Sequence, residues 1–320
     1  MTEPSTTRRS SPGGYAVSDS LAAAGFVADP RIALVETARP GRTPYDAVVC
    51  QNAWNFLPRD HYARLVTEYA PRRRALYLAR RRVAAHNTRR ARTNVVLSTY
   101  MRDLLAARGR RTTLAEVTLP WDLCTADDVA SAGAGSLRAA ASSATGLPPV
   151  HRPFVLVPGT LTWYKSPGYA LDLLARIPAA ERPLLVLAGT DDGSGCAQDT
   201  RSRAAAAGIE AWIGPAERPT MKWLLAHAQL TLVPSRLESL SFSMAEALLL
   251  SPRVAALPIP VHGEMVERLG RRPVWLTDDP AAVDLDELLA PLEPVDPVDV
   301  APFRAQWFEL AGVLNEAGRA

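Results

Sequence analysis

The chain has 320 residues, of which 48% are hydrophobic and 22% charged, and its formal net charge is +3. This composition is ordinary for a globular protein, and the length favours two domains of ordinary size. No apolar run approaches the ~18 residues that a membrane-spanning helix needs, and the polar N-terminus lacks the apolar core of a secretory signal. We therefore expect a cytoplasmic protein.

The cysteines and lysines of the chain are few. Cys50, Cys124 and Cys196 are widely spaced with no Cys or His close by, so neither a disulfide framework nor a zinc site is indicated. We expect them to be small buried hydrophobes. The only lysines are Lys165 and Lys222, and all the other Lys and Arg positions are arginines. A lysine in a motif position is therefore more informative than an arginine.

The first third of the chain alternates between apolar and amphipathic segments. Residues 1–12 are polar and predicted to be disordered, and Gly13 and Gly14 then precede a short helical pattern that ends at Gly25. The strands predicted after it cover 31–36, 45–51, 74–78, 93–98 and 115–120, and the helices cover 61–70 and 101–109. This alternation is typical of a parallel sheet covered by helices on both faces.

A second alternation follows a change of composition. Residues 125–150 are rich in Ala, Ser and Gly and end near Pro-Pro, which is typical of an interdomain linker. We therefore predict an N-terminal domain over 1–124, a C-terminal domain over 151–298 and a last helix over 299–320 that packs back towards the N-terminal domain. Both domains are expected to be doubly wound, with ligands bound outside the carboxyl ends of the strands, in the cleft between the domains.

The segment FVLVPGTLTWYKSPG has the features of a diphosphate site. Gly159 ends a predicted buried strand, and Lys165 follows six residues later, just before Ser-Pro and a helix. The amides of a glycine turn can cradle phosphate oxygens while an ammonium offsets their charge. The alternative is a solvated loop lysine, the commonest fate of this residue, but the scarcity of lysine favours the functional interpretation.

The stretch from Leu230 to Glu264 begins as a strand, breaks at Pro-Ser and resumes as a helix from about Met244 to Leu250. Glu238 and Glu246 lie on either side of the break with seven residues between them. A small-residue turn that enters a helix offers amides and the positive dipole end to an anion. The alternatives are that Glu246 only completes an S-x-x-E capping box with Ser243, and that Glu238 forms a weak surface ion pair.

Together these segments resemble the donor domain of the retaining glycosyltransferases of family four. The family's Pro-Ser turn, followed by Glu, seven residues and Glu-Ala, matches residues 234–247, and its Gly-Arg-Leu-x-x-x-Lys segment matches residues 159–165 in spacing. The resemblance covers roughly residues 151–280 and is weaker towards the N-terminus. It implies an α/β protein of the GT-B fold, with two Rossmann-like domains facing a central cleft.

The resemblance also implies roles for individual residues. Lys165 would contact the donor diphosphate, Glu246 the ribose hydroxyls, and Glu238 the donor sugar, which makes Glu238 and Lys165 the expected catalytic residues. Further donor contacts are expected from Gly159, Thr160, Ile213, Gly214, Leu240, Ser241, Phe242 and Ser243. The acceptor side is expected to include Gly13, Gly14, Asn52, Trp54 and His262.

The chain departs from the family pattern at Thr160, where relatives have an arginine that contacts the diphosphate. Losing one such charge-assisted pair costs ~1.5–3 kcal/mol unless another residue replaces it. No histidines have metal-pair spacing, and no Asp-x-Asp lies at a strand end. We therefore predict a metal-independent enzyme without a cofactor, whose co-substrate is a nucleoside diphosphate sugar, with uridine as the base.

A run of arginines at 72–74, 80–82, 89, 90 and 92 contains no acidic residue. A solvated helix in an arginine-rich protein explains it, although such a run can also steer an anionic donor or contact an anionic membrane. Nucleic acid is not expected, because no recognition module or aromatic platform accompanies the charge.

The function expected from these patterns is transfer of a sugar, with retention, to a hydroxyl or amine of a small molecule such as a natural product. Two alternatives stay open. One is a non-catalytic nucleotide-binding protein of the same fold, and the other is a membrane-associated transferase that acts on a lipid-linked or polysaccharide acceptor. The oligomeric state is not indicated.

Overall fold

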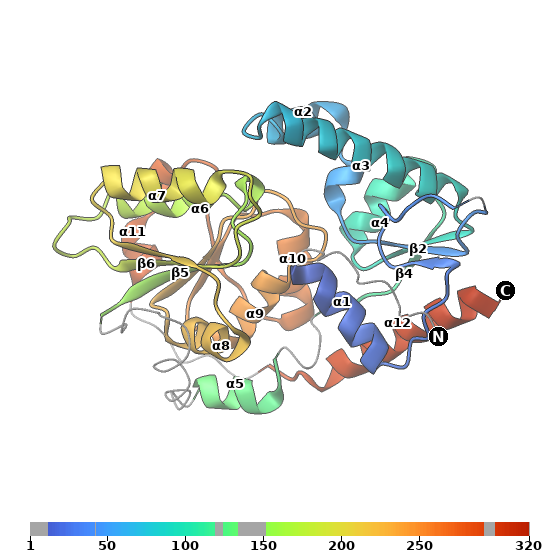
Figure 1. The fold of residues 1–320 in the computed structure, drawn as a ribbon. Coiled ribbons are helices and arrows are strands. Elements are labelled where there is room, and N and C mark those ends of the chain that lie inside the picture. The colour runs from blue at the N-terminus through green and yellow to red at the C-terminus, as the bar shows by residue number, and fades with distance from the viewer. Residues whose placement is uncertain (1–11, 42, 119–123, 134–151, 291–297, 320) are drawn as a thin grey trace, which may run out of the picture.

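The computed structural model of the chain describes residues 12–41, 43–118, 124–133, 152–290 and 298–319. Within these residues the strands form two parallel sheets, one of four strands and one of six. Figure 1 shows the sheets in two separate units, each with its own covering helices. The predicted disordered segment up to residue 11 and most of the predicted linker lie outside the described residues.

The N-terminal sheet has the order β1-β2-β3-β4, so each new strand is added to the same edge. Its strands are β1 (Ile32–Ala33), β2 (Ala47–Cys50), β3 (Thr93–Val96) and β4 (Thr112–Leu114). The helical elements of this unit are α1 (Pro12–Ala23), η1 (Ala53–Phe56), α2 (Arg59–Leu65), α3 (Pro71–Arg90) and α4 (Thr99–Ala106). The short central strands are almost wholly buried, as a sheet covered on both faces requires.

Three predictions for this unit are wrong. Residues 74–78 form part of α3, which Pro71 opens and alanines and arginines extend, since these residues favour helix over strand. The last strand is β4, upstream of the predicted 115–120; residues 115–118 are outside any strand, and 119–120 are not described. Gly13 and Gly14 lie in the first turn of α1 instead of in a loop before it.

The C-terminal sheet has the order β10-β9-β8-β5-β6-β7. Its strands are β5 (Phe154–Pro158), β6 (Leu184–Ala188), β7 (Ala211–Gly214), β8 (Leu230–Val233), β9 (Val254–Ala256) and β10 (Val274–Trp275). The chain runs outward from β5 to β7, returns to place β8 on the other side of β5, and runs outward again. The strand order therefore reverses between β5 and β8, and a reversal of this kind opens a crevice at the carboxyl ends of the two strands.

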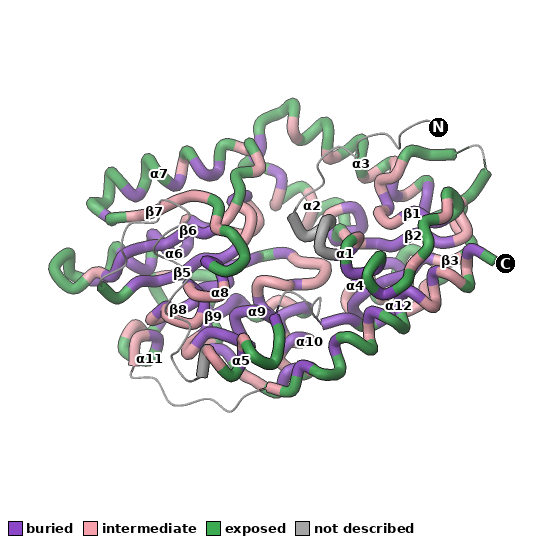
Figure 2. The backbone as a smooth tube through the Cα atoms, turned by 60° about the horizontal axis from the view of Figure 1, so that its bottom comes forward, coloured by how far each residue is buried: buried purple, intermediate pink, exposed green. Residues whose placement is uncertain are grey.

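Helices cover both faces of this sheet, and each face has its own apolar core. These helices are α5 (Ala126–Gly133), η2 (Trp163–Lys165), α6 (Pro167–Leu174), α7 (Cys196–Ala206), α8 (Arg218–His227), α9 (Phe242–Leu250), α10 (Pro260–Leu269), η3 (Pro280–Ala282) and α11 (Leu285–Leu289). The strands at the centre of this unit are buried along their length (Figure 2).

The last helix, α12 (Ala301–Arg319), joins the two units. Phe303, near its start, packs in the core of the C-terminal unit, whereas Trp307, Leu310 and Leu314 pack against α1 and the N-terminal sheet. Figure 1 shows this helix, in red, running beneath α1. The N-terminal unit is thus completed by residues from the far end of the chain.

Candidate functional site

Gly159, the residue after β5, has a backbone conformation that favours glycine. Its φ is +109°, a value that residues with a side chain rarely adopt. A Cβ at this position would lie 3.0 Å from Ser243 Oγ and 3.2 Å from Lys165 Nζ. Glycine therefore allows the two predicted donor residues to converge over the end of the strand.

Glycines also follow or end the two neighbouring strands, at Gly189 and Gly214. The amide of Gly189 donates to the carbonyl of Gly214 at 2.8 Å, and a Cβ on Gly189 would lie only 1.7 Å from the Gly159 carbonyl oxygen. The carboxyl ends of β5, β6 and β7 thus form an edge of closely packed glycine backbone. The predicted residues Ile213 and Thr160 lie at this edge and are both half-buried.

Lys165 is the last residue of η2, and the chain turns sharply after it. Ser166 has φ 49° and ψ 50°, the left-handed conformation, and is the only residue besides glycine with positive φ in the described part of the chain. Backbone strain of this kind persists where the surrounding structure imposes it, often at ligand sites. Here the turn places Lys165 at the strand end and starts α6 at Pro167.

Lys165 and Glu238 form an ion pair in which Nζ lies 2.8 Å from Oε1. The two side chains come from the loops that follow β5 and β8, the strands at which the sheet order reverses. They are 14% and 10% exposed, so their charges are little screened by solvent. Burial raises the pKa of the neighbouring Tyr164, and the charge of Glu238 raises it further, which keeps this phenol neutral.

Glu246 is buried and forms an ion pair with Arg218, the first residue of α8. The capping-box alternative is wrong, because α9 begins at Phe242 with Ser241 as its N-cap and no side-chain cap bond. Ser243 therefore lies inside the first turn. Nothing in the sequence singled out Arg218, one of many arginines, as the partner of Glu246.

His262 lies in α10 and not in the loop where the sequence placed it. Its side chain is completely buried; Nδ1 contacts the Leu257 carbonyl oxygen at 2.8 Å and Nε2 contacts Ser241 Oγ at 3.3 Å. Burial lowers the pKa of His262 to about 4, so the imidazole is neutral at pH 7. It links α10 to the N-cap of α9, and its predicted contact with an acceptor stays a prediction.

A buried carboxylate that the sequence did not indicate lies beneath the predicted acceptor residues. Glu36 accepts hydrogen bonds from the Gln51 amide at 2.8 Å and from Nδ2 of Asn52 and Asn55, each at 2.7 Å. Burial raises the pKa of Glu36, and these donors lower it in part. The carboxylate fixes the start of η1, the short helix that carries Trp54.

Trp54 lies in an aromatic cluster at the junction of the units. Its ring stacks on Tyr77, with centroids 5.5 Å apart and planes at 9°, and meets Tyr164 edge-on at 5.4 Å. Tyr69 joins the cluster, and its hydroxyl lies 2.7 Å from Thr162 Oγ1. The structure thus brings predicted acceptor residue Trp54 against the residue that precedes Lys165.

The loop after β8 also contacts the N-terminal sheet. Leu237 packs in a core cluster of the N-terminal unit. The Ser239 hydroxyl donates to the Gln51 carbonyl, and the Ser98 hydroxyl donates to the Ser239 carbonyl at 2.7 Å. Because Gln51 and Ser98 follow β2 and β3, the carboxyl ends of both sheets face this loop.

The remaining predicted residues lie in the loop after β8, at the start of α9 and in α1. Leu240 and Phe242 pack against the cores of both units, and Val17 and Leu21 of α1 belong to the N-terminal one. Gly13 and Gly14 begin that same helix.

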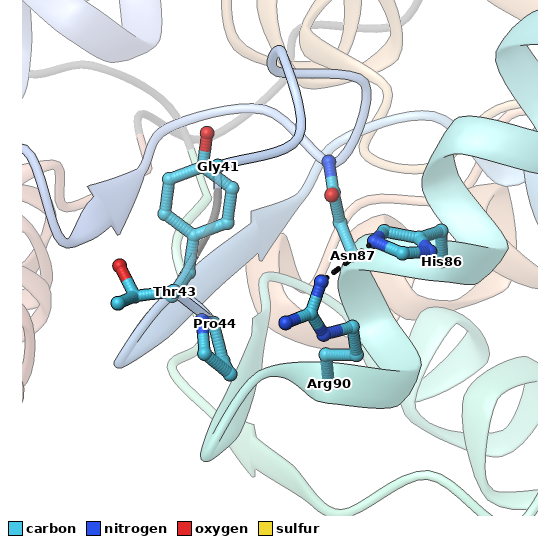
Figure 3. Close-up of a pocket in the computed structure, with 7 residues that line it drawn as sticks. Gly41, Thr43, Pro44, His86, Asn87 and Arg90 are labelled. Carbon is cyan, nitrogen blue, oxygen red and sulfur yellow. Dashed lines mark hydrogen bonds between the residues drawn. The ribbon is translucent and has the colours of Figure 1, made fainter.

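Figure 3 shows a small cavity elsewhere in the N-terminal unit, with His86 and Arg90 in contact on one side. Its volume of about 10 Å³ suffices for roughly one water molecule. It includes residues 43–45, just before β2, and therefore lies at the amino end of this strand, away from the edge where parallel sheets bind ligands.

Among the described residues, no group of three or more His, Cys, Asp or Glu could hold a metal ion. Nor is any helix in the described ranges long and apolar enough to cross a membrane.

Comparison with known proteins identifies the fold. No family model and no curated protein matches the chain. Among solved structures it is similar to sucrose-phosphate synthase from Thermosynechococcus elongatus, with 16% identity, a TM-score of 0.54, and coverage of 85% of this chain and 62% of that one. It is also similar to WaaG, a glycosyltransferase involved in lipopolysaccharide biosynthesis, with 15% identity, a TM-score of 0.55, and coverage of 87% and 75%.

A third similar structure is the trehalose 6-phosphate synthase from Burkholderia multivorans, with 11% identity, a TM-score of 0.52, and coverage of 85% and 62%. The chain thus spans less than two thirds of the length of the first and third of these proteins. The chain has the GT-B fold, with two Rossmann-like units, as the sequence predicted.

Proposed function

We propose that the chain is a glycosyltransferase that moves a sugar, with retention, from a nucleoside diphosphate to a hydroxyl or amine of a small molecule. The observation that carries this proposal is the 2.8 Å pair of Lys165 and Glu238 at the crevice between β5 and β8. The GT-B fold supports it, since the similar structures include sucrose-phosphate synthase and the glycosyltransferase WaaG.

The chemical task is to break the bond between the anomeric carbon and a diphosphate oxygen. Negative charge grows on the leaving diphosphate, and positive charge grows on the sugar. Lys165 offsets the negative charge on the diphosphate, helped by the positive end of the α9 dipole near Gly159. Glu238, beside Lys165, holds the sugar and stabilises the positive charge that grows on it. The acceptor oxygen or nitrogen attacks from the leaving-group face and gives its proton to the departing phosphate oxygen, so no protein base is required.

The nucleotide would lie along the glycine edge of β5, β6 and β7. In this proposal Glu246 accepts hydrogen bonds from the ribose hydroxyls of uridine, while Ile213 and Gly214 line the base. Arg218 holds Glu246 in place through their ion pair. It also adds a cation on the nucleotide side, which replaces the guanidinium that the family has at the position of Thr160.

The acceptor would enter from the N-terminal unit. Trp54 and Asn52 lie at the carboxyl edge of that sheet, and Trp54 touches the residue before Lys165. A flat aromatic wall beside a carboxamide suits the apolar face and hydroxyls of a small polyol or sugar-like acceptor.

Donor binding and turnover test the proposal, and the two lysines provide a matched pair. Lys165 pairs with Glu238 and Lys222 with Asp128, and both lysines are largely buried. With a panel of uridine diphosphate sugars, we expect Lys165→Ala to weaken donor binding about ten- to a hundredfold, equivalent to ~1.5–3 kcal/mol. Lys222→Ala should bind the donor like the wild type. Titration calorimetry and thermal shift measure both.

Turnover is measured by release of nucleoside diphosphate and by the anomeric configuration of the product. Glu238→Gln should still bind the donor and lose turnover. If the wild type binds the nucleotide but transfers sugar to no acceptor, the chain is instead a nucleotide-binding protein of this fold. Equal effects of the two lysine variants on donor binding would show that the assignment of the site is wrong.

A further inference from the structure

A basic groove lies between α2 and α3, on the N-terminal unit. It is lined by Arg59, Tyr62, Leu78, Arg81, Arg82 and Ala85, and its volume is about 350 Å³. Figure 1 shows these two helices beside each other at the edge of the molecule. The volume falls within the roughly 300–1,000 Å³ of small-molecule sites, and no residue that lines it is acidic.

The positive charge of the groove is not offset by carboxylates. Arg59, Arg81, Arg82 and the nearby Arg108 take part in none of the ion pairs between described residues. Burial lowers the pKa of Arg81, and the charges of Arg108 and Arg59 lower it further. These guanidinium groups repel one another, so an anion among them would be favoured.

Backbone carbonyls hold two of these guanidinium groups in fixed positions. Arg81 donates to the Leu57 carbonyl and, at 3.3 Å, to the Trp54 carbonyl. Arg108 donates to the same Leu57 oxygen at 2.6 Å and to the Phe56 carbonyl at 2.9 Å. Because these bonds are already formed, little conformational entropy would be lost when a ligand binds.

Tyr62 supplies a polar group at the same place. The Arg81 guanidinium lies over the Tyr62 ring, with its carbon 4.8 Å from the ring centre. The Tyr62 hydroxyl is buried and has no hydrogen-bond partner among the described residues. The ring of Tyr62 thus supports the Arg81 guanidinium at the lining of the groove.

The groove adjoins the proposed site through aromatic contacts. The Tyr62 and Trp54 rings meet edge-on at 6.1 Å, and Trp54 meets Tyr164, which precedes Lys165. The groove therefore lies on the acceptor side, with Trp54 between it and the Lys165–Glu238 pair.

We propose that the groove between α2 and α3 binds the phosphate ester group of an anionic acceptor. Fixed arginines match the paired oxygens of a phosphate better than a lysine does, and the volume leaves space for the group that the phosphate carries. The proposal that this ligand is the acceptor rests on the proposed function, whereas phosphate binding by the groove does not. The ester could belong to a soluble molecule or to a lipid headgroup.

Two double variants with equal charge test the groove. Arg59→Gln/Arg82→Gln removes two exposed arginines that line it, and Arg72→Gln/Arg80→Gln removes two exposed arginines of α3 that do not. Glycerol phosphate is titrated by calorimetry at fixed ionic strength, and vesicles of phosphatidylglycerol or phosphatidylcholine by cosedimentation. We expect the groove variant to lose at least tenfold in affinity and the control variant less than twofold.

The two arms distinguish the source of the ester. Groove-dependent binding of glycerol phosphate identifies a soluble ligand, and groove-dependent binding of phosphatidylglycerol vesicles alone identifies a lipid headgroup. Equal losses in both variants, or no saturable binding of either probe, would overturn the proposal. Uridine diphosphate, titrated in parallel, should bind equally well to the groove variant and the wild type, so failure of the donor site is seen separately.

Discussion

At the scale of single residues, the two carboxylates of the candidate site each face a cation from a distant segment. Glu238 faces Lys165, and Glu246 faces Arg218. His262 has no charged partner in contact and is neutral because it is buried. Removal of Lys165 or Glu238 leaves the other charge uncompensated in a largely buried position, which makes these two positions sensitive to substitution.

His262 gives the stability of the protein a pH dependence. Its pKa is about 4 in the folded chain, against an ordinary value of 6.5. Between these values the unfolded chain binds more protons, so stability falls as the pH drops from 6.5 towards 4, by up to about 3 kcal/mol. The raised pKa of Glu36 makes stability rise as the pH falls, opposite to the effect of His262. The contribution of His262 is therefore measured by comparing the wild type with a His262 variant.

The measurement is urea unfolding of the wild type and of His262→Gln across this pH range. We expect the difference in unfolding free energy between them to shrink as the pH falls. His86→Gln, at an exposed position, should run parallel to the wild type. If the His262→Gln curve is also parallel, burial of a neutral imidazole is not the cause.

A glycine at a strand end and a glycine in a helix differ in what a side chain would meet. A Cβ at Gly189 would clash with the Gly159 carbonyl at 1.7 Å, whereas a Cβ at Gly263, in α10, would meet nothing within 4 Å. We expect Gly189→Ala to destabilise the protein by at least the ~1–3 kcal/mol typical of overpacking. Gly263→Ala should stabilise it by about 0.4–1 kcal/mol, as Gly→Ala does in a helix.

Thermal unfolding of the two variants checks this pair. Because both changes add one methyl group, a loss of stability at Gly263 as large as that at Gly189 would contradict the packing at the strand ends.

At the scale of elements, strand order decides where the site lies. The chain adds β6 and β7 to one side of β5 and then β8 to the other. The loops after β5 and β8 are therefore neighbours at the crevice, although about seventy residues separate Lys165 from Glu238. In the N-terminal sheet the described strands are added in one direction only, so that sheet has no such reversal within them.

The helix α12 supplies part of the core of the N-terminal unit. Trp307 is completely buried against that unit, while the adjacent Phe308 is 45% exposed. We expect Trp307→Ala to cost about 3–5 kcal/mol of unfolding free energy, the usual effect of removing a buried aromatic side chain. Phe308→Ala should cost less than about 1 kcal/mol, mainly through its contact with Arg304.

Chemical denaturation measures both variants, and hydrogen exchange of β2 and β3 shows where stability is lost. If Trp307→Ala leaves these strands protected, α12 is not required for the N-terminal core.

At the scale of the whole molecule, hydrogen bonds between charged side chains and backbone groups join the two units. Arg73 of α3 donates to the Asp192 carbonyl at 2.6 Å. Glu264 of α10 accepts from the amides of Thr99 and Tyr100 at 2.9 and 2.7 Å, at the positive end of α4. These contacts fix the position of the N-terminal unit relative to the C-terminal unit.

Removal of Glu264 should loosen this junction. We expect Glu264→Ala to speed hydrogen exchange of the Thr99 and Tyr100 amides by about tenfold or more, since a bond to a charged group contributes ~1.5–3 kcal/mol. Glu267→Ala, an exposed change on the same helix, should leave both amides as they are in the wild type. NMR measures the exchange rates of both amides. Unchanged rates in Glu264→Ala would mean that the carboxylate does not hold the units together.

The sequence by itself predicted the strand that ends before Gly159 and the strand that begins at Leu230, and it singled out Lys165, Glu238 and Glu246 as candidate donor residues. Those strands are continuous apolar runs bounded by glycine or proline, and such patterns are local. In the N-terminal unit the local pattern failed at residues 74–78, because a short apolar run between arginines fits helix as well as strand. Leu76 and Leu78 of this run are exposed, so the run does not form the buried strand that its apolar content predicted.

Only the tertiary structure decided which side chains meet. The partners of Glu246, Glu36 and His262, the reversal between β5 and β8, and the groove between α2 and α3 all depend on segments far apart in the chain. Their distances follow from strand order and helix packing, which periodicity along the sequence does not encode. Spacing along the chain therefore singled out Lys165, Glu238 and Glu246, whose role in donor binding stays a prediction, whereas their partners required the fold.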